Sequence, residues 1–252
     1  MHPPSPATLA TLATAAGRRE PPVIELLRGF PTRWAEHGRA AGAEAQEDAV
    51  ARQTFLGVLE AMTHPGRIVR LPARPNGRAA PMPASAALAL ALALLEDDTP
   101  VWLGPGIAAQ AAPLRHRVCG HRRARFALVQ AADAHPRLWH ELGADGATGS
   151  APGSTDDQEG ATLLIEVPGL LADPPPPRCE PGDLELMPRL QISAPGLLRR
   201  QTRLAVDGLA RHFWRERMTH EADGRPATVE VLLVCADRIA AIPRCARVQL
   251  DD

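Results

Sequence analysis

The run DAVARQTFLGVLEAMTHPGRIVRL, residues 48–71, decides the fold class because it predicts a helix and a strand in direct succession. Its first part carries an apolar stripe at helical spacing, made of Val50, Phe55, Val58, Leu59 and Met62. Asp48 is placed to cap this helix, and Pro65-Gly66 ends it. Residues 67–71 then alternate polar and apolar side chains, which is typical of a half-buried strand.

The rest of the chain repeats this mixture of helices and apolar strands. A second helix is expected at residues 86–95 with Ser85 as its cap, and a third at residues 202–218 with Leu204, Leu209 and Phe213 inward. Further strands are predicted at residues 101–103, 126–129, 161–167, 190–193, 229–235, 239–242 and 247–250. Helices that interleave with apolar strands predict a three-layer α/β domain with a mixed sheet.

The ends and the loops set the expected boundaries of this domain. Residues 1–22 are predicted to be a loose tail closed by two prolines, and residues 23–252 a single domain that opens with a short helix at 23–28. Residues 143–160 are rich in Gly, Ser, Thr and Asp, which predicts a long flexible loop. Four consecutive prolines at 174–177 predict a rigid connection.

The charged residues exclude several kinds of chemistry. All 28 basic residues are arginine, and the chain contains no lysine. It therefore cannot form an internal lysine Schiff base or supply the lysine of a phosphate-binding loop. The net charge of −1 is unlike that of a nucleic-acid-binding domain, so no nucleic-acid partner is expected.

Cysteine usage and hydropathy predict the compartment. The four cysteines contain no C-x-x-C spacing, which favours free thiols in a reducing environment. The first 20 residues lack the pattern of a secretory signal, and the most apolar run, residues 86–95, is shorter than the roughly 20 residues that span a bilayer. A cytoplasmic protein without a membrane partner is expected.

The densest charge lies in RHRVCGHRRAR, residues 115–125, with five arginines and two histidines. Arginine matches phosphate and carboxylate geometry bidentately, so a triphosphate or an acidic partner surface fits this segment. A solvated basic loop before the strand at 126 is the favoured interpretation. Arg115 and His116 are the preferred candidates for ligand or partner binding.

Other candidate sites each have a structural alternative. His116, Cys119 and His121 have the spacing of metal ligands, but a structural zinc needs a fourth ligand, so ordinary loop residues are favoured. Asp97 and Asp98 suit Mg²⁺ binding or acid–base work, whereas Asp before Thr99-Pro100 is also ordinary turn chemistry.

Two further residues, Trp102 and Glu159, and the absence of two motifs bear on possible chemistry. Trp102 is favoured as a core or interface residue over a stacking platform. Glu159 fits the end of a loop or a contact with a partner. Neither a nucleophile motif nor a phosphate loop is visible in the sequence.

Several motifs in a fixed order give the chain a resemblance to a known family. They are FLGVLEAMTHPG at 55–66, DTPVWL at 98–103, LRH at 114–116, EGATL at 159–163 and RIAAIPR at 238–244. Together they resemble PhnH, a subunit of the bacterial carbon–phosphorus lyase machinery for phosphonate degradation. The matching positions mark Asp98, Thr99, Arg115, His116, Glu159 and Arg244 as candidates for ligand or partner binding.

The chain departs from the family pattern in three places. Leu56 stands where the family usually has arginine, and SAPGL at 193–197 replaces a Gly-Pro-Gly-Ile-like turn. RPATVE at 225–230 replaces a Phe-Pro-x-Gly-x-Asp run, so Thr228 and Glu230 stand where glycine and aspartate are usual. These two changes weaken the case for a ligand at that loop.

The resemblance implies a fold, partners and a reaction. The fold would resemble that of PLP-dependent transferases, without PLP, and the absence of lysine independently excludes that aldimine chemistry. The chain would be a homodimer that works with PhnG, PhnI and PhnJ, helped by PhnL. That complex transfers phosphonate onto the ribose of ATP with release of adenine and is a ribose 1-methylphosphonate 5-triphosphate synthase, with MgATP as its substrate.

Three functions are consistent with these observations. The first is an interaction subunit that is inactive alone, favoured because no nucleophile, base and phosphate loop occur together. The second is a stand-alone nucleotide- or anion-binding transferase that uses residues 115–125. The third is a degenerate PLP-fold binding module. No catalytic residue and no metal ligand is assigned.

Overall fold

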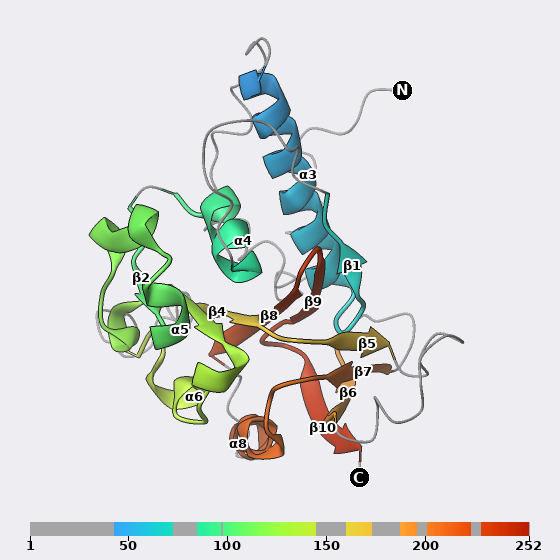
Figure 1. Ribbon diagram of the computed structural model, residues 1–252. Coiled ribbons are helices and arrows are strands. Elements are labelled where there is room, and N and C mark those ends of the chain that lie inside the picture. The colour runs from blue at the N-terminus through green and yellow to red at the C-terminus, as the bar shows by residue number, and fades with distance from the viewer. Residues whose placement is uncertain are drawn as a thin grey trace, which may run out of the picture.

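The computed structural model describes residues 43–72, 85–96, 98–144, 160–172, 187–195, 201–222 and 228–251 (Figure 1). The predicted tail at 1–22, the helix at 23–28, the four-proline segment and residues 145–159 of the glycine-rich loop lie outside these ranges. The described residues form a mixed α/β structure with two sheets. None of the described helices is long and apolar enough to cross a bilayer.

The larger sheet is mixed, as the sequence predicts. Six strands lie in the order β1-β9-β8-β4-β3-β2. Strands β8, β4, β3 and β2 run parallel to one another. Strand β9 is antiparallel to β8 on one side and to β1 on the other. The bounds are β1 Val69–Arg70, β2 Val101–Leu103, β3 Phe126–Gln130, β4 Ala161–Glu166, β8 Val229–Cys235 and β9 Arg238–Ile242.

Both faces of this sheet are buried, which explains why β4 and β8 read as continuous apolar runs. In β4, Leu163 and Ile165 belong to one apolar cluster, and Leu164 belongs to another on the opposite face. Helices α3 (Ala43–Thr63) and α4 (Ala86–Leu94) cover the face that carries Leu164. Helix α8 (Arg211–Ala222) and the second sheet lie on the other side (Figure 1). The prediction of a mixed α/β fold with a mixed sheet is confirmed, and the face opposite α3 and α4 is covered by α8 and a second sheet.

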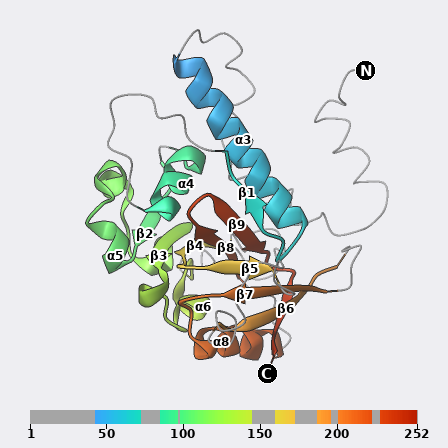
Figure 2. The ribbon, with the colours of Figure 1, turned by 45° about the vertical axis from the view of Figure 1, so that its right-hand side comes forward.

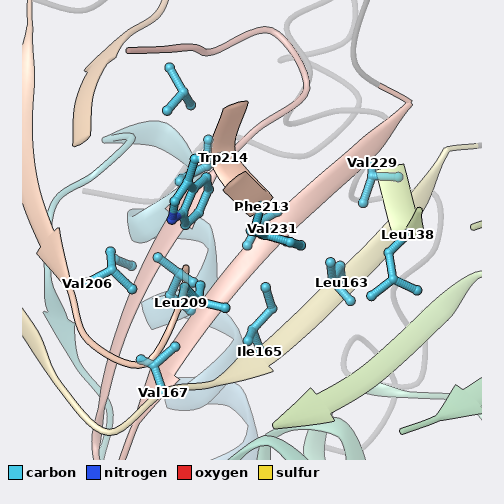
Figure 3. Packing of buried hydrophobic residues seen from close by; sticks show 14 of the residues in the cluster. Leu138, Leu163, Ile165, Val167, Val206, Leu209, Phe213, Trp214, Val229 and Val231 are labelled. Atoms are coloured by element: carbon cyan, nitrogen blue, oxygen red, sulfur yellow. The ribbon is translucent and has the colours of Figure 1, made fainter. Parts of the chain in front are cut away.

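The core below the large sheet is built around aromatic side chains of α8. Phe213 and Trp214 are fully buried, with their rings T-shaped at 5.2 Å between centroids. Figure 3 shows them with Ile165 of β4, Val231 of β8 and the loop residue Leu209, which belong to the same apolar cluster. The short helix α6 (Leu138–Glu141) contributes Trp139, whose Nε1 donates to the carbonyl oxygen of Phe213 at 2.8 Å.

The second sheet was not expected from the sequence. It is antiparallel, with its strands in the order β10-β6-β7-β5 (Figure 2). In the sequence, three of its strands, β5, β6 and β7, come after β4 and before β8. The bounds are β5 Leu170–Ala172, β6 Arg189–Ser193, β7 Thr202–Val206 and β10 Arg247–Asp251. Strands β6 and β10 had been predicted, but as members of a single sheet.

The helix predicted at residues 202–218 is wrong in its first half. Residues 202–206 form β7, which pairs with β6 along four register positions, and the helix begins only at Arg211. Gly208 separates them with φ +77°, and a Cβ there would lie 2.7 Å from Pro168 Cδ. This break is incompatible with one continuous helix, although Leu204, Leu209 and Phe213 are buried as expected.

The first two helices are close to their predictions. Helix α3 ends at Thr63, as the Pro65-Gly66 signal predicts, but it begins at Ala43, so Asp48 lies inside the helix and does not cap it. Ser85 does cap α4: its side chain accepts a hydrogen bond from Leu88 N at 3.1 Å. Four further short helices occur among the described residues: α5 Pro105–Ala108, η2 Ala112–Arg117, η3 His121–Arg123 and η4 Ala131–Asp133.

Gly66, in the Pro65-Gly66 pair that ends α3, has a positive φ and close neighbours that leave little room for a side chain. Gly66 has φ +77°, and a Cβ there would lie 2.8 Å from Ile192 Cδ1. We expect Gly66→Ala to lower the free energy of unfolding by about 2 kcal/mol, because alanine is strained at positive φ and the site is full. Urea denaturation followed by circular dichroism measures this.

Gly120→Ala is the matched control for that experiment. Gly120 has φ −66°, and nothing lies within 4 Å of its added Cβ. Its substitution should change stability by less than about 0.5 kcal/mol. Equal losses in the two variants would show that the turn at Gly66 does not have the conformation described.

Candidate functional site

The described residues marked by the family motifs lie along one edge of the large sheet, where its parallel strands begin. Thr99 and Pro100 precede β2, Arg125 precedes β3, and Gly160 precedes β4. Backbone hydrogen bonds join these segments: Arg125 N donates to Pro100 O at 3.1 Å, and Thr162 N donates to Arg125 O at 2.8 Å. We call this row the amino edge. Glu159 lies outside the described residues, next to Gly160.

The amino edge holds two separate groups rather than one site. Asp98, Thr99, Arg115 and His116 belong to the β2 end, whereas Arg244 follows β9. In the sheet order, β9 and β2 are four steps apart, or about 19 Å at the usual spacing of strands. Side chains at the two ends therefore do not converge on one small ligand.

At the β9 end, Arg244 forms an ion pair with Glu230. Its Nε lies 3.1 Å from Glu230 Oε1, and the two side chains are 17% and 4% exposed. The guanidinium also packs on Gly160, where a Cβ would collide with it and lie 2.6 Å from Thr228 O. Glu230 stands where the family usually has aspartate. Its carboxylate therefore lies inside the protein, where it pairs with Arg244.

Arg217 of α8 lies beneath the same turn and is fully buried. Its Nη2 donates to Pro243 O at 3.1 Å and to Ala246 O at 3.0 Å, and its Nη1 donates to Val229 O at 3.3 Å. Its guanidinium also stacks over the Trp139 ring at 5.3 Å. Arg217 therefore fastens the β9–β10 turn to the first residue of β8.

Arg217, Glu230 and Arg244 form what we call the buried charge cluster. All three act electrostatically on Cys245, an exposed residue of the same turn, where partial burial of the thiol raises its pKa above the ordinary value and Glu230 adds to this effect. The backbone N–H of Cys245 and the two arginines oppose the rise. Sequence reasoning missed Arg217, although its position four residues after Phe213 on the inner face of α8 was a usable signal.

At the β2 end, residues 115–125 include the second half of η2 and the whole of η3, and the segment is held against the sheet. Cys119 N donates to Val101 O at 2.9 Å, and Val118 forms an isolated parallel bridge with Val101. Leu114 and Ala124 are buried at the two ends of the segment. The segment is therefore fixed at both ends and is not a loose loop.

The basic side chains of this segment divide into two sets. Arg117 Nη1 donates to Glu96 O at 2.8 Å, and His121 pairs with Glu141 at 3.1 Å, so these two serve local structure. The remaining basic side chains are exposed: Arg115, His116, Arg122, Arg123 and Arg125. With Val118, which is 47% exposed, they make up what we call the basic surface.

The other candidate residues near β2 lie in a turn or pack against the core. Asp98 is exposed and belongs to a turn in which Thr99 N donates to Glu96 O at 3.3 Å. Asp97 lies outside the described residues. Trp102 packs against the main core and meets His121 edge-on at 6.1 Å. Partial burial raises the pKa of the Cys119 thiol, and the charge of Arg123 lowers it in part. No group of three metal-ligating side chains occurs within the described ranges.

The opposite edge, at the carboxyl ends of the parallel strands, carries polar residues that the sequence analysis overlooked. Ligands in α/β sheets usually bind there. Glu166, the last residue of β4, accepts hydrogen bonds from Ser85 Oγ at 2.5 Å and Ala86 N at 3.0 Å at the start of α4. Asp133 accepts one from Gly106 N at 2.8 Å in α5. A polar residue ending an apolar strand, as in ATLLIE, was the available signal.

These contacts show what the described polar residues do at the amino and carboxyl edges of the large sheet. The carboxylates of the carboxyl edge hold the chain's own helices, and the buried charge cluster holds a turn. The basic surface presents exposed arginines, His116 and Val118 on a fixed scaffold, and His116 Nε2 accepts a hydrogen bond from Arg117 Nε at 3.1 Å. The fold and site thus define a mixed α/β protein that exposes a group of basic side chains beside β2.

Comparison with known proteins then identifies the family. A model of the family PhnH, described as a bacterial phosphonate metabolism protein, matches residues 43–249. The chain belongs to this family, as the order of its motifs predicted. A comparison with curated proteins finds no significant match.

Proposed function

We propose that the chain is an interaction subunit of a carbon–phosphorus lyase core complex. In this role it supports the transfer of phosphonate onto the ribose of ATP with release of adenine, and it has no activity alone. Its partners are PhnG, PhnI and PhnJ, assisted by PhnL, and MgATP is a substrate of the complex. The same proposal includes a cytoplasmic location, a homodimer of the free subunit and a relation to the PLP-transferase fold.

Membership of a phosphonate metabolism family supports the pathway. One structural observation favours a subunit over an enzyme: Glu166 and Asp133, at the edge where α/β proteins usually bind substrate, accept hydrogen bonds from backbone amides of α4 and α5. A general base must reach its substrate, and these two carboxylates already serve the helices.

Complex formation tests this proposal. The purified chain, mixed with co-expressed PhnG, PhnI and PhnJ of the same bacterium, should elute with them in size-exclusion chromatography at a mass that includes this subunit. Separate elution at both low and physiological ionic strength would refute the proposal.

A stand-alone nucleotide- or anion-binding transferase is the second candidate, favoured by the exposed Arg115. Titration of the isolated chain with MgATP in a calorimeter separates the two. The enzyme predicts tight binding that Arg115→Ala weakens, whereas the subunit predicts no tight binding in either protein.

A further inference from the structure

The basic surface is unusual in the sequence and in its presentation. No Asp or Glu occurs between Asp98 and Asp133, a stretch that contains five arginines. Among the described residues, Val118 and Leu56 are the two large apolar side chains that are substantially exposed, at 47% and 53%. Along the sequence, Val118 stands between Arg115 and the pair Arg122 and Arg123, and all four side chains are exposed. The segment thus carries an exposed apolar residue with exposed arginines before and after it in the chain.

We propose that the basic surface is the docking site for an acidic segment of a partner subunit, with carboxylates on either side of an apolar residue. This inference rests on the proposed function and assigns a place on the chain to it. Arginine forks bind carboxylates bidentately, and the apolar residue of the partner covers Val118.

The fixed backbone makes such docking favourable. The bonds of residues 118–125 to β2 and to Pro100 hold the segment in place before a partner arrives. Binding therefore orders side chains but not the loop that carries them, which lowers the entropic cost. Positive charge on a rigid surface also speeds encounter with an acidic partner, and this effect weakens with added salt.

The same geometry disfavours a nucleotide triphosphate as the occupant. An exposed valine among the arginines offers nothing to phosphate groups. Arg115, Arg122 and Arg123 come from 3₁₀ helices of six and three residues, and such short helices supply less of the aligned dipole with which a longer α-helix binds phosphate.

Charge reversal tests the proposal. The probe is the co-purified PhnG–PhnI–PhnJ complex of the same bacterium, and its affinity for the full chain is measured by biolayer interferometry. Arg115→Glu with Arg123→Glu should lower the affinity at least about tenfold at low ionic strength, with a smaller difference at high salt. The control pair is Arg215→Glu with Arg247→Glu, exposed residues of α8 and β10, which should bind like the wild type.

A second pair of variants tests the apolar contact without changing charge. Val118→Ser should weaken binding about fivefold, because about 1 kcal/mol of apolar contact is lost, whereas Leu56→Ser should leave the affinity unchanged. Thermal unfolding of each variant verifies that it is folded. Since all these side chains are exposed, we expect wild-type stability.

The possible failures are distinguishable. If the wild type binds the partner complex and the Arg115/Arg123 variant binds equally well, the docking site is wrong and the proposed function stands. If the wild type does not bind the complex, the proposed function falls and the docking site with it. If the double variant loses tight MgATP binding while its affinity for the subunits is unchanged, the surface is a nucleotide site and the inference is overturned.

Discussion

Replacing Arg217 with methionine should lower the free energy of unfolding by at least about 3 kcal/mol. The change removes charge-assisted hydrogen bonds to the carbonyl oxygens of Val229, Pro243 and Ala246 and leaves them buried. It also removes the stacking on Trp139. Methionine keeps much of the side-chain volume, so the loss reports on polar contacts rather than on a cavity. Urea denaturation measures the change.

Arg215→Met provides the matched control. Arg215 lies two residues earlier in the same helix, and its side chain is exposed. The same chemical change there should cost less than about 0.5 kcal/mol. A loss at Arg217 no larger than that at Arg215 would mean that the β9–β10 turn does not depend on the buried arginine.

Replacing Glu230 with alanine should cost about 2–3 kcal/mol, the second largest expected effect. The carboxylate is 4% exposed and lies 3.1 Å from Arg244 Nε, so its removal leaves a guanidinium with little access to water. Because Arg244 keeps some solvent contact, the expected cost is below that of a fully buried pair. A double-mutant cycle with Arg244→Met isolates the interaction, and the double variant should lose less than the sum of the two single losses.

The exposed pair of Glu60 and Arg67 is the comparison for that cycle. Its atoms are 3.3 Å apart, but the side chains are 45% and 58% exposed. Glu60→Ala should therefore cost less than about 0.5 kcal/mol, because solvent screens the attraction. Equal effects at Glu60 and Glu230 would contradict the description of Glu230 as buried and paired.

Local signals were sufficient to predict much of the large sheet and its first helices. The cap at Ser85, the stop at Pro65-Gly66 and the apolar run of β4 each act within a few residues, so they can be read directly from the sequence. The order of the family motifs likewise predicted the family that the comparison shows.

The features that were missed depend on contacts between distant residues. Strand β7 is short and only partly apolar, so local sequence does not predict it. It forms because it pairs with β6 and because the chain breaks at Gly208 before α8. Arg217 is an ordinary helix residue until Pro243 and Ala246 fold over it. The separation of Arg244 from Arg115 follows from strand order, which no local pattern encodes.

The most direct test of the proposed function is an assay of adenine release from ATP and methylphosphonate. The subunit interpretation predicts no release by the purified chain alone, weak release by PhnG, PhnI, PhnJ and PhnL without it, and strong release when the chain is added. Robust adenine release by the chain alone would contradict this interpretation.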